Sequence, residues 1–403
     1  MTTTFSISEP REIIGLVPYR MGFVPRNSVV MLSLRGARRR IGLLTRMDLP
    51  APQHAEELAR VLVHHLLRDE ASAGLFMVYS DHADPLGADR SAVMPLLEAV
   101  RREMAAGDID LPDAWHVGPS RYRSITCSNE CCPAEGWPVG ELLSTVLGAE
   151  MTMLGSSYVD TRADAMPDLG PVDADRLAAV ERCAVQAAPR VGARAGARVV
   201  EMRRGRWAAR VMRTWRREVA RLGSSRGVAG ETSRTTVGDE AADESLWRRE
   251  VDLDARTAGL LLAGMQDVCI RDAFMLTCIP GAGEEAERLA MNGTVTPLVD
   301  MLFAGVFHES CAVEPEPSLN EPAIMLLFAL ARQATGRMAA PPLALLGWLF
   351  WWKGNGAIAL HCLEAAVAAD AEHRLARLLL CSLEQGIGPG WAQRRKLEDA
   401  AAV

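Results

Sequence analysis

Short apolar runs and amphipathic stretches alternate along the first third of the chain. Residues 27–36 and 40–50 are apolar runs joined by the segment "RGARRR", which predicts a strand hairpin with an arginine-rich tip. The apolar run at 73–80 is followed by turn-forming residues and predicts another strand. Residues 114–125 are expected to add one or two more strands. Together these runs predict a sheet.

Two stretches between these runs repeat their apolar residues at helical spacing. Residues 52–70 place apolar side chains three or four positions apart, which predicts an amphipathic helix. Residues 89–108 predict a second helix, in which Pro95 either introduces a kink or marks the first turn. Alternating strands and helices are typical of an α/β fold. We therefore expect an α/β domain over residues 1–137, with helices packed on a mixed sheet.

The periodicity from residue 138 onward is almost wholly helical, which predicts a mainly α-helical domain over residues 138–403. Residues 222–246 are rich in Gly, Ser and Thr and have no apolar period, so we expect a flexible linker there. Residues 340–373 match one tetratricopeptide repeat, and the next 34 residues match poorly. The sequence therefore predicts a single TPR-like helical hairpin. Its matching positions are Leu346, Gly347, Phe350, Gly354, Ala359, Leu363 and Ala366.

Composition indicates a folded protein with an acidic balance. Hydrophobic residues make up 49% of the chain and charged residues 24%, and the formal charge is −7. An acidic average surface does not favour nucleic acid as the general partner, because phosphate binding needs clustered cations. The longest apolar run, at 339–352, is too short to cross a bilayer and predicts a buried core helix. With no signal-peptide pattern at the start, we expect a cytoplasmic protein without a membrane span.

Three of the nine cysteines lie close together, at Cys127, Cys131 and Cys132. They could hold zinc if His116 or Cys183 supplied a fourth ligand, or Cys127 could form a disulfide with one of the other two under oxidation. Structural zinc sites usually use two separated Cys-x2-Cys pairs, which this segment lacks. We therefore favour small side chains in a tight turn at the junction of the two domains. No cofactor is predicted, and zinc remains the alternative.

Polar residues follow several predicted strands of the α/β domain. Ligands in open α/β sheets bind beyond the carboxyl ends of the strands. Such a pocket would suit an enzyme acting on a phosphorylated or acidic small molecule, with arginines neutralising the anion and Asp48 or Asp81 as base. Ordinary surface turns are the other interpretation. The candidate residues are Arg46, Asp48, Asp81, His82, Arg121, Tyr122 and Arg123.

Residues 190–221 predict a basic amphipathic helix. Arginines recur every three or four residues on one face, and an apolar stripe that includes Trp207 and Trp215 lies opposite. The simplest interpretation is a packed helix whose arginines face solvent. Alternatives are binding of nucleic acid or an acidic partner, or of an anionic membrane surface. The arginines of the predicted face are Arg206, Arg210, Arg213, Arg217 and Arg221.

Four segments carry a family resemblance: "VPYRMGFVPRNSVVMLSLRG", "RIGLLTRMDLP", "RYRSITCSNECCPAEGWPV" and "GNGAIALHCLEAAVAADAEHRLARLLLCSLEQG". In content and order they resemble the actinobacterial domain-of-unknown-function family 4192. The resemblance implies a bacterial cytoplasmic protein with an α/β N-terminal part and a helical C-terminal part. It implies no assigned activity.

Our leading hypothesis is a binding or regulatory module that uses helical surfaces for an unknown protein partner or acidic ligand. Convergence of Arg46, Asp48, Tyr122 and Arg123 in a deep cleft would favour the enzyme instead.

Overall fold

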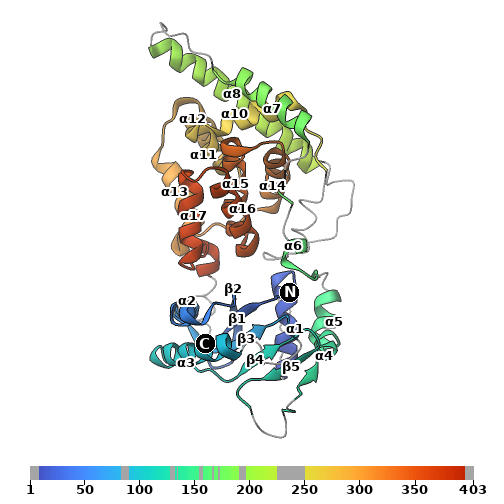
Figure 1. Cartoon of the computed structure of the whole chain (residues 1–403). Coiled ribbons are helices and arrows are strands. Elements are labelled where there is room, and N and C mark those ends of the chain that lie inside the picture. Colours follow the sequence, from blue (N-terminus) through green and yellow to red (C-terminus); the bar gives the residue numbers. More distant parts are fainter. Residues whose placement is uncertain are drawn as a thin grey trace. The chain divides into compact units, whose positions relative to one another are not determined.

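The computed structural model describes residues 9–82, 90–127, 132–133, 135–153, 158–165, 168–170, 173–189, 197–224 and 250–394. The chain divides into two compact units, Met1–Ala165 and Met166–Glu398 (Figure 1). The first unit contains a sheet with helices, and the second is mainly helical. The predicted fold class is therefore confirmed.

The sheet of the first unit has six strands in the order β2-β1-β3-β4-β5-β6. Strands β3 and β4 are parallel, and all other neighbours are antiparallel, so the sheet is mixed as predicted. The predicted arginine-tipped hairpin is β1 and β2, which pair up to Arg35 and Arg40. The strands are β1 (Ser28–Arg35), β2 (Arg40–Asp48), β3 (Ala71–Tyr79), β4 (Ala114–Val117), β5 (Arg121–Ser124) and β6 (Trp137–Pro138).

Helices cover both faces of this sheet because its central strands are apolar on both sides. Helices α2 and α3 pack on the face that carries Val29 and Phe76, and α1 packs on the face that carries Val30 and Met77. Pro95 lies inside α3, beyond its first turn. The helices are η1 (Pro52–His54), α1 (Pro10–Met21), α2 (Ala55–Arg68), α3 (Arg90–Ala106), α4 (Gly140–Leu143), α5 (Val146–Met153) and α6 (Arg162–Ala165).

The second unit is a bundle of helices, and none of its described residues forms a strand. The predicted linker at 222–246 lies outside the described residues except for Leu222–Ser224, which form the end of α8. The longer helices are α7 (Ala174–Ala187), α8 (Ala197–Ser224), α10 (Ala255–Met265), α11 (Val268–Thr277), α12 (Gly283–Asn292), α13 (Pro297–Phe307), α14 (Pro317–Arg332), α15 (Ala340–Lys353), α16 (Gly356–Ala369) and α17 (Arg374–Glu384). The short 3-10 helices are η2 (Glu309–Cys311) and η3 (Gly336–Met338).

Helix α15 forms the centre of the second unit's core. Every residue from Ala340 to Trp352 is buried, so the prediction of a core helix is confirmed. A Cβ atom at Gly347 would lie 2.4 Å from Leu363 Cγ, which shows how closely α15 and α16 approach. These two helices are the predicted hairpin, and its TPR likeness stays a prediction. Among the described residues, no helix is both long and apolar enough to cross a membrane.

Candidate functional site

The residues expected to line an α/β pocket begin at the end of β2. Arg46 Nη2 lies 2.5 Å from Asp48 Oδ1, and Arg46 Nε donates to Ser28 Oγ at 2.8 Å. The side chain of Asp48 is 79% exposed. Burial lowers the pKa of Arg46, although the Asp48 carboxylate opposes this shift. Arg46 is therefore satisfied by its own strand and by β1.

Asp81 and His82 lie in the exposed turn after β3. Asn27 Nδ2 donates to Asp81 Oδ2 at 2.6 Å, and Arg26 Nη1 lies 3.8 Å from Asp81 Oδ1. The backbone N–H of His82 donates to Ser80 Oγ at 3.0 Å. These contacts fasten the turn to the residues just before β1.

Arg121, Tyr122 and Arg123 point alternately to the two faces of β5. Tyr122 is 4% exposed, and its ring stacks on Trp137 with 5.5 Å between centroids. Arg121 Nη1 donates to the carbonyl oxygen of Gly136 at 2.7 Å. Tyr122 therefore belongs to the apolar core on one face, while the two arginines lie on the other.

Among the candidate pocket residues, Arg46 and Asp81 lie at the same edge of the sheet, since Arg26 contacts both of them. The residues of β5 lie further away. Strand β2, with Arg46 and Asp48, is four places from β5 in the strand order. Four inter-strand steps separate them by about 19 Å. Tyr122 and Arg123 also lie on opposite faces. Among the described residues, these candidates do not form a set of nucleophile, base and orienting group.

The cysteine-rich turn is described only in part. Cys127 and Cys132 are half-buried, and Cys131 lies outside the described residues. The start of the turn is held by hydroxyl groups, since Ser124 Oγ donates to Asp113 Oδ1 at 2.7 Å and the Cys127 N–H donates to Ser124 Oγ at 3.0 Å. In the described part of the chain, no three His, Cys, Asp or Glu side chains are grouped to hold a metal ion. Zinc binding and disulfide formation stay predictions.

The 28-residue helix α8 has the predicted division into two faces. Val211 and Trp215 are buried, and Trp207 and Val219 pack half-buried against the same core. Because both tryptophans pack inside the unit, the helix lacks the exposed aromatic residues that interfacial membrane binding uses. All five arginines of the predicted face are exposed. The helix contains nine arginines and two glutamates, although the whole chain has a charge of −7.

Two other arginines of α8 have structural roles. Arg204 makes two hydrogen bonds, of 2.9 and 2.7 Å, to the carboxylate of Asp267 at the start of α11. These hydrogen bonds raise the pKa of Arg204. Arg216 forms an ion pair with Glu287 and donates to the carbonyl oxygen of Gly283 at 2.6 Å. These contacts fasten α8 to α11 and α12.

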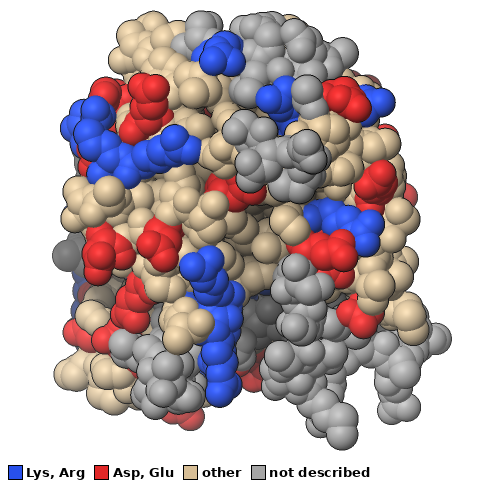
Figure 2. Space-filling model, turned by 90° about the horizontal axis from the view of Figure 1, so that it is seen from below, with Lys and Arg blue, Asp and Glu red and all other residues tan. Residues whose placement is uncertain are grey.

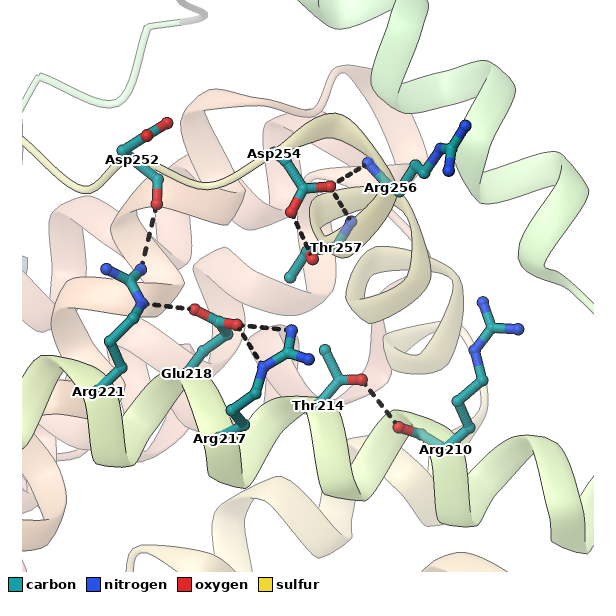
Figure 3. Close-up of polar contacts among 9 residues, drawn as sticks. All are labelled: Arg210, Thr214, Arg217, Glu218, Arg221, Asp252, Asp254, Arg256 and Thr257. Carbon is teal, nitrogen blue, oxygen red and sulfur yellow. Dashed lines mark hydrogen bonds and ion pairs between the residues drawn. The ribbon is translucent and has the colours of Figure 1, made fainter.

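Arg217 and Arg221 share one buried carboxylate, that of Glu218 (Figure 3). Arg217 Nη2 and Arg221 Nε each donate to it at 2.8 Å, and Arg221 Nη2 also donates to the carbonyl oxygen of Asp252 at 3.1 Å. Burial alone would raise the pKa of Glu218, but the two arginines outweigh it and the pKa is lowered. The predicted arginine face did not include Glu218, although the spacing of Glu218 and Arg221 on a helix is one that predicts an ion pair.

The positive charges of the remaining arginines of the face are not neutralised by nearby carboxylates among the described residues. Arg206 Nη2 lies 3.7 Å from Met202 Sδ. The side chains of Arg210 and Arg213 have no hydrogen-bond or ion-pair partner among the described residues, and in Figure 3 Arg210 points away from Glu218. We call Arg206, Arg210 and Arg213 the arginine row. It extends for about 10 Å along α8.

Figure 2 shows one face of the molecule, on which the charges are mixed. On the face in Figure 2, the coloured Lys and Arg side chains are interspersed with Asp and Glu side chains. The arginine row differs because α8 supplies so few acidic neighbours. Guanidinium groups at this spacing suit carboxylate or phosphate groups.

The chain is thus an α/β unit followed by a helical unit with one strongly basic helix. The family described as Domain of unknown function (DUF4192) matches residues 10–295 and 309–390. The chain belongs to this family, which confirms the resemblance seen in its sequence. Comparison with curated proteins and with solved structures gave no match.

Proposed function

We propose that this protein is a binding module that holds an acidic partner on the arginine row of α8. The observation that supports it is that Arg210 and Arg213 are exposed and have no partner among the described residues of a chain whose net charge is −7. Exposed guanidinium groups bind carboxylates through paired, charge-assisted hydrogen bonds. The buried side of α8 holds the helix in place, so the backbone that carries the arginine row loses little conformational entropy on binding.

The alternative enzyme draws less support from the α/β unit. Arg46 is engaged by Asp48 and Ser28, and Tyr122 is part of an apolar core. An anion-binding catalytic site needs several such groups to converge on one substrate. We keep the cytoplasm as the setting, for which the odd number of cysteines is the support.

The proposal is tested by binding of a fluorescein-labelled polyglutamate peptide to the full chain, followed by fluorescence anisotropy. We expect the triple variant Arg206→Ala, Arg210→Ala, Arg213→Ala to bind at least about tenfold more weakly, because each exposed charge pair contributes up to about 1 kcal/mol. We also expect wild-type binding to weaken as salt is added.

A control variant removes the same charge elsewhere. Arg38, Arg101 and Arg374 are exposed and lie outside α8. Replacing all three by Ala should leave peptide binding within about twofold of the wild type. Equal losses in the two triple variants would show that only net charge matters, and the proposal would be wrong.

A further inference from the structure

A cavity of about 590 Å³ lies beside α8, between this helix, α12 and α14. Its apolar lining comes from Trp215, Val219 and Ala220 of α8 and from Leu319 of α14. Gly223 also faces it, and the absence of a side chain there, together with the methyl group of Ala220, leaves the space open. A cavity of this size can accept a large side chain of a partner.

Four polar residues around this cavity, Trp215, Thr277, Arg216 and Glu287, are already engaged, and the exposed residue Glu284 lies at its edge. Trp215 is 1% exposed, and its Nε1–H donates to Thr277 Oγ1 at 3.0 Å. On the wall, Arg216 and Glu287 form an ion pair. Because these groups are satisfied, the floor of the cavity offers mainly apolar surface to a ligand. It favours an aliphatic or aromatic group over a charged one.

The cavity and the arginine row lie on neighbouring flanks of the same helix. Ala220 is exposed at the cavity and lies seven residues after Arg213 and three after Arg217. Residues three apart are neighbours on a helix surface, and residues seven apart lie on the same face about 10 Å from each other along the axis. One extended segment can therefore contact the arginines and reach the cavity at the same time.

We propose that the partner is an acidic peptide segment with one bulky apolar side chain, which fills this cavity while its carboxylates bind the arginine row. This inference rests on the proposed function and specifies the class of partner. A peptide side chain can offer the apolar floor an aliphatic or an aromatic group, whereas a nucleotide can offer only its aromatic base. The acidic balance of the chain also opposes a long polyanion.

The test compares two labelled glutamate-rich peptides of equal length and charge, one with a central leucine and one with a central serine. We expect the leucine peptide to bind the full chain about tenfold more tightly, as burial of one aliphatic side chain implies. The variant Ala220→Trp places a large ring at the cavity and should abolish this advantage. It should leave binding of the serine peptide unchanged.

The matched control is Ala105→Trp, at an exposed position of α3. It should preserve the tenfold preference for leucine, and circular dichroism should show that both tryptophan variants are folded. If the triple arginine variant binds both peptides like the wild type, the proposed function is wrong. If it weakens both but Ala220→Trp keeps the leucine preference, the anchor inference alone is wrong. Tighter binding of a single-stranded oligonucleotide that is insensitive to Ala220→Trp would also overturn it.

Discussion

Glu218 shows how one buried side chain sets the charge that α8 presents. Its carboxylate accepts hydrogen bonds from Arg217 and Arg221, so two of the five exposed arginines share one negative charge. The positive charge open to a ligand is consequently concentrated at Arg210 and Arg213. Sequence periodicity placed all five arginines on one face correctly. It could not rank them, because the ranking depends on which side chains the fold turns toward Glu218.

We predict that Glu218→Gln destabilises the second unit by about 1–2 kcal/mol at neutral pH, since hydrogen bonds to a charged group are lost. The pKa of Glu218 is lowered in the folded protein. Its stabilising effect is therefore fully present above the pKa of the unfolded chain, about 4.3, and is lost as the pH falls through the lower folded value. The difference in unfolding free energy between variant and wild type, measured by urea titration, should shrink below about pH 4.

The same substitution should increase the affinity for an acidic peptide although it lowers the stability, because Arg217 and Arg221 then lose their carboxylate partner. The polyglutamate peptide should then bind more tightly although the protein is less stable. The control is Glu384→Gln on α17, an exposed glutamate, which should change neither quantity. A Glu218→Gln variant as stable as the wild type from pH 3 to 8 would contradict the role given to this carboxylate.

The sequence pattern reveals some of the residues that hold neighbouring helices together, but not others. Gly347 is one of the positions that match a tetratricopeptide repeat, and α15 and α16 approach each other closely there. We predict that Gly347→Ala destabilises the second unit by about 1–3 kcal/mol, because its Cβ would overlap Leu363. Thermal unfolding measured by calorimetry tests this.

Gly356 is the matched position for that experiment. It begins α16, and a Cβ atom there would have its nearest neighbour at 3.8 Å. Gly356→Ala should be neutral or slightly stabilising, because alanine restricts the unfolded chain. If both alanine variants have the same melting temperature, the close approach at Gly347 does not contribute to stability.

The elements that could be predicted are those with a strong local period. Strands β1, β2 and β3 and helices α2, α3 and α15 follow runs of apolar residues that need no distant partner to be recognised. Helix α1 was missed because Pro18 interrupts its pattern. The contacts of Arg204 and Arg216 were also missed. Their partners Asp267 and Glu287 lie more than 60 residues along the chain, and only the folded bundle brings them near.

The division of the chain into units determines where a stable fragment can end. Residue 137, the expected boundary, falls within β6, which pairs with β5. Beyond it, Leu142 of α4 is 7% exposed and belongs to the core under α1. A cut at 137 removes this side chain and also Pro138, the partner of Arg121 in the pairing of β5 with β6. The sequence shows where helical periodicity begins, but it does not show that the first helices after 138 complete the sheet's core.

We predict that a fragment of residues 1–165 folds alone and unfolds cooperatively, and that a fragment of residues 1–137 has a lower melting temperature. The loss of Leu142 from the core alone should cost about 2 kcal/mol. Circular dichroism during heating measures both. A 1–137 fragment as stable as the longer one would place the unit boundary at the earlier position.

Helix α15 also has a large effect on the tryptophan fluorescence of the protein. Its three indole side chains, Trp348, Trp351 and Trp352, are all buried, and a fourth, Trp391, donates to the carbonyl oxygen of Trp352. Of the nine tryptophans, the α/β unit contains only Trp115 and Trp137. Excitation at a wavelength that only tryptophan absorbs therefore reports mainly on the helical unit. Fluorescence will therefore register the opening of the helical bundle strongly and the melting of the sheet weakly, so a single emission trace should not be taken for the whole protein.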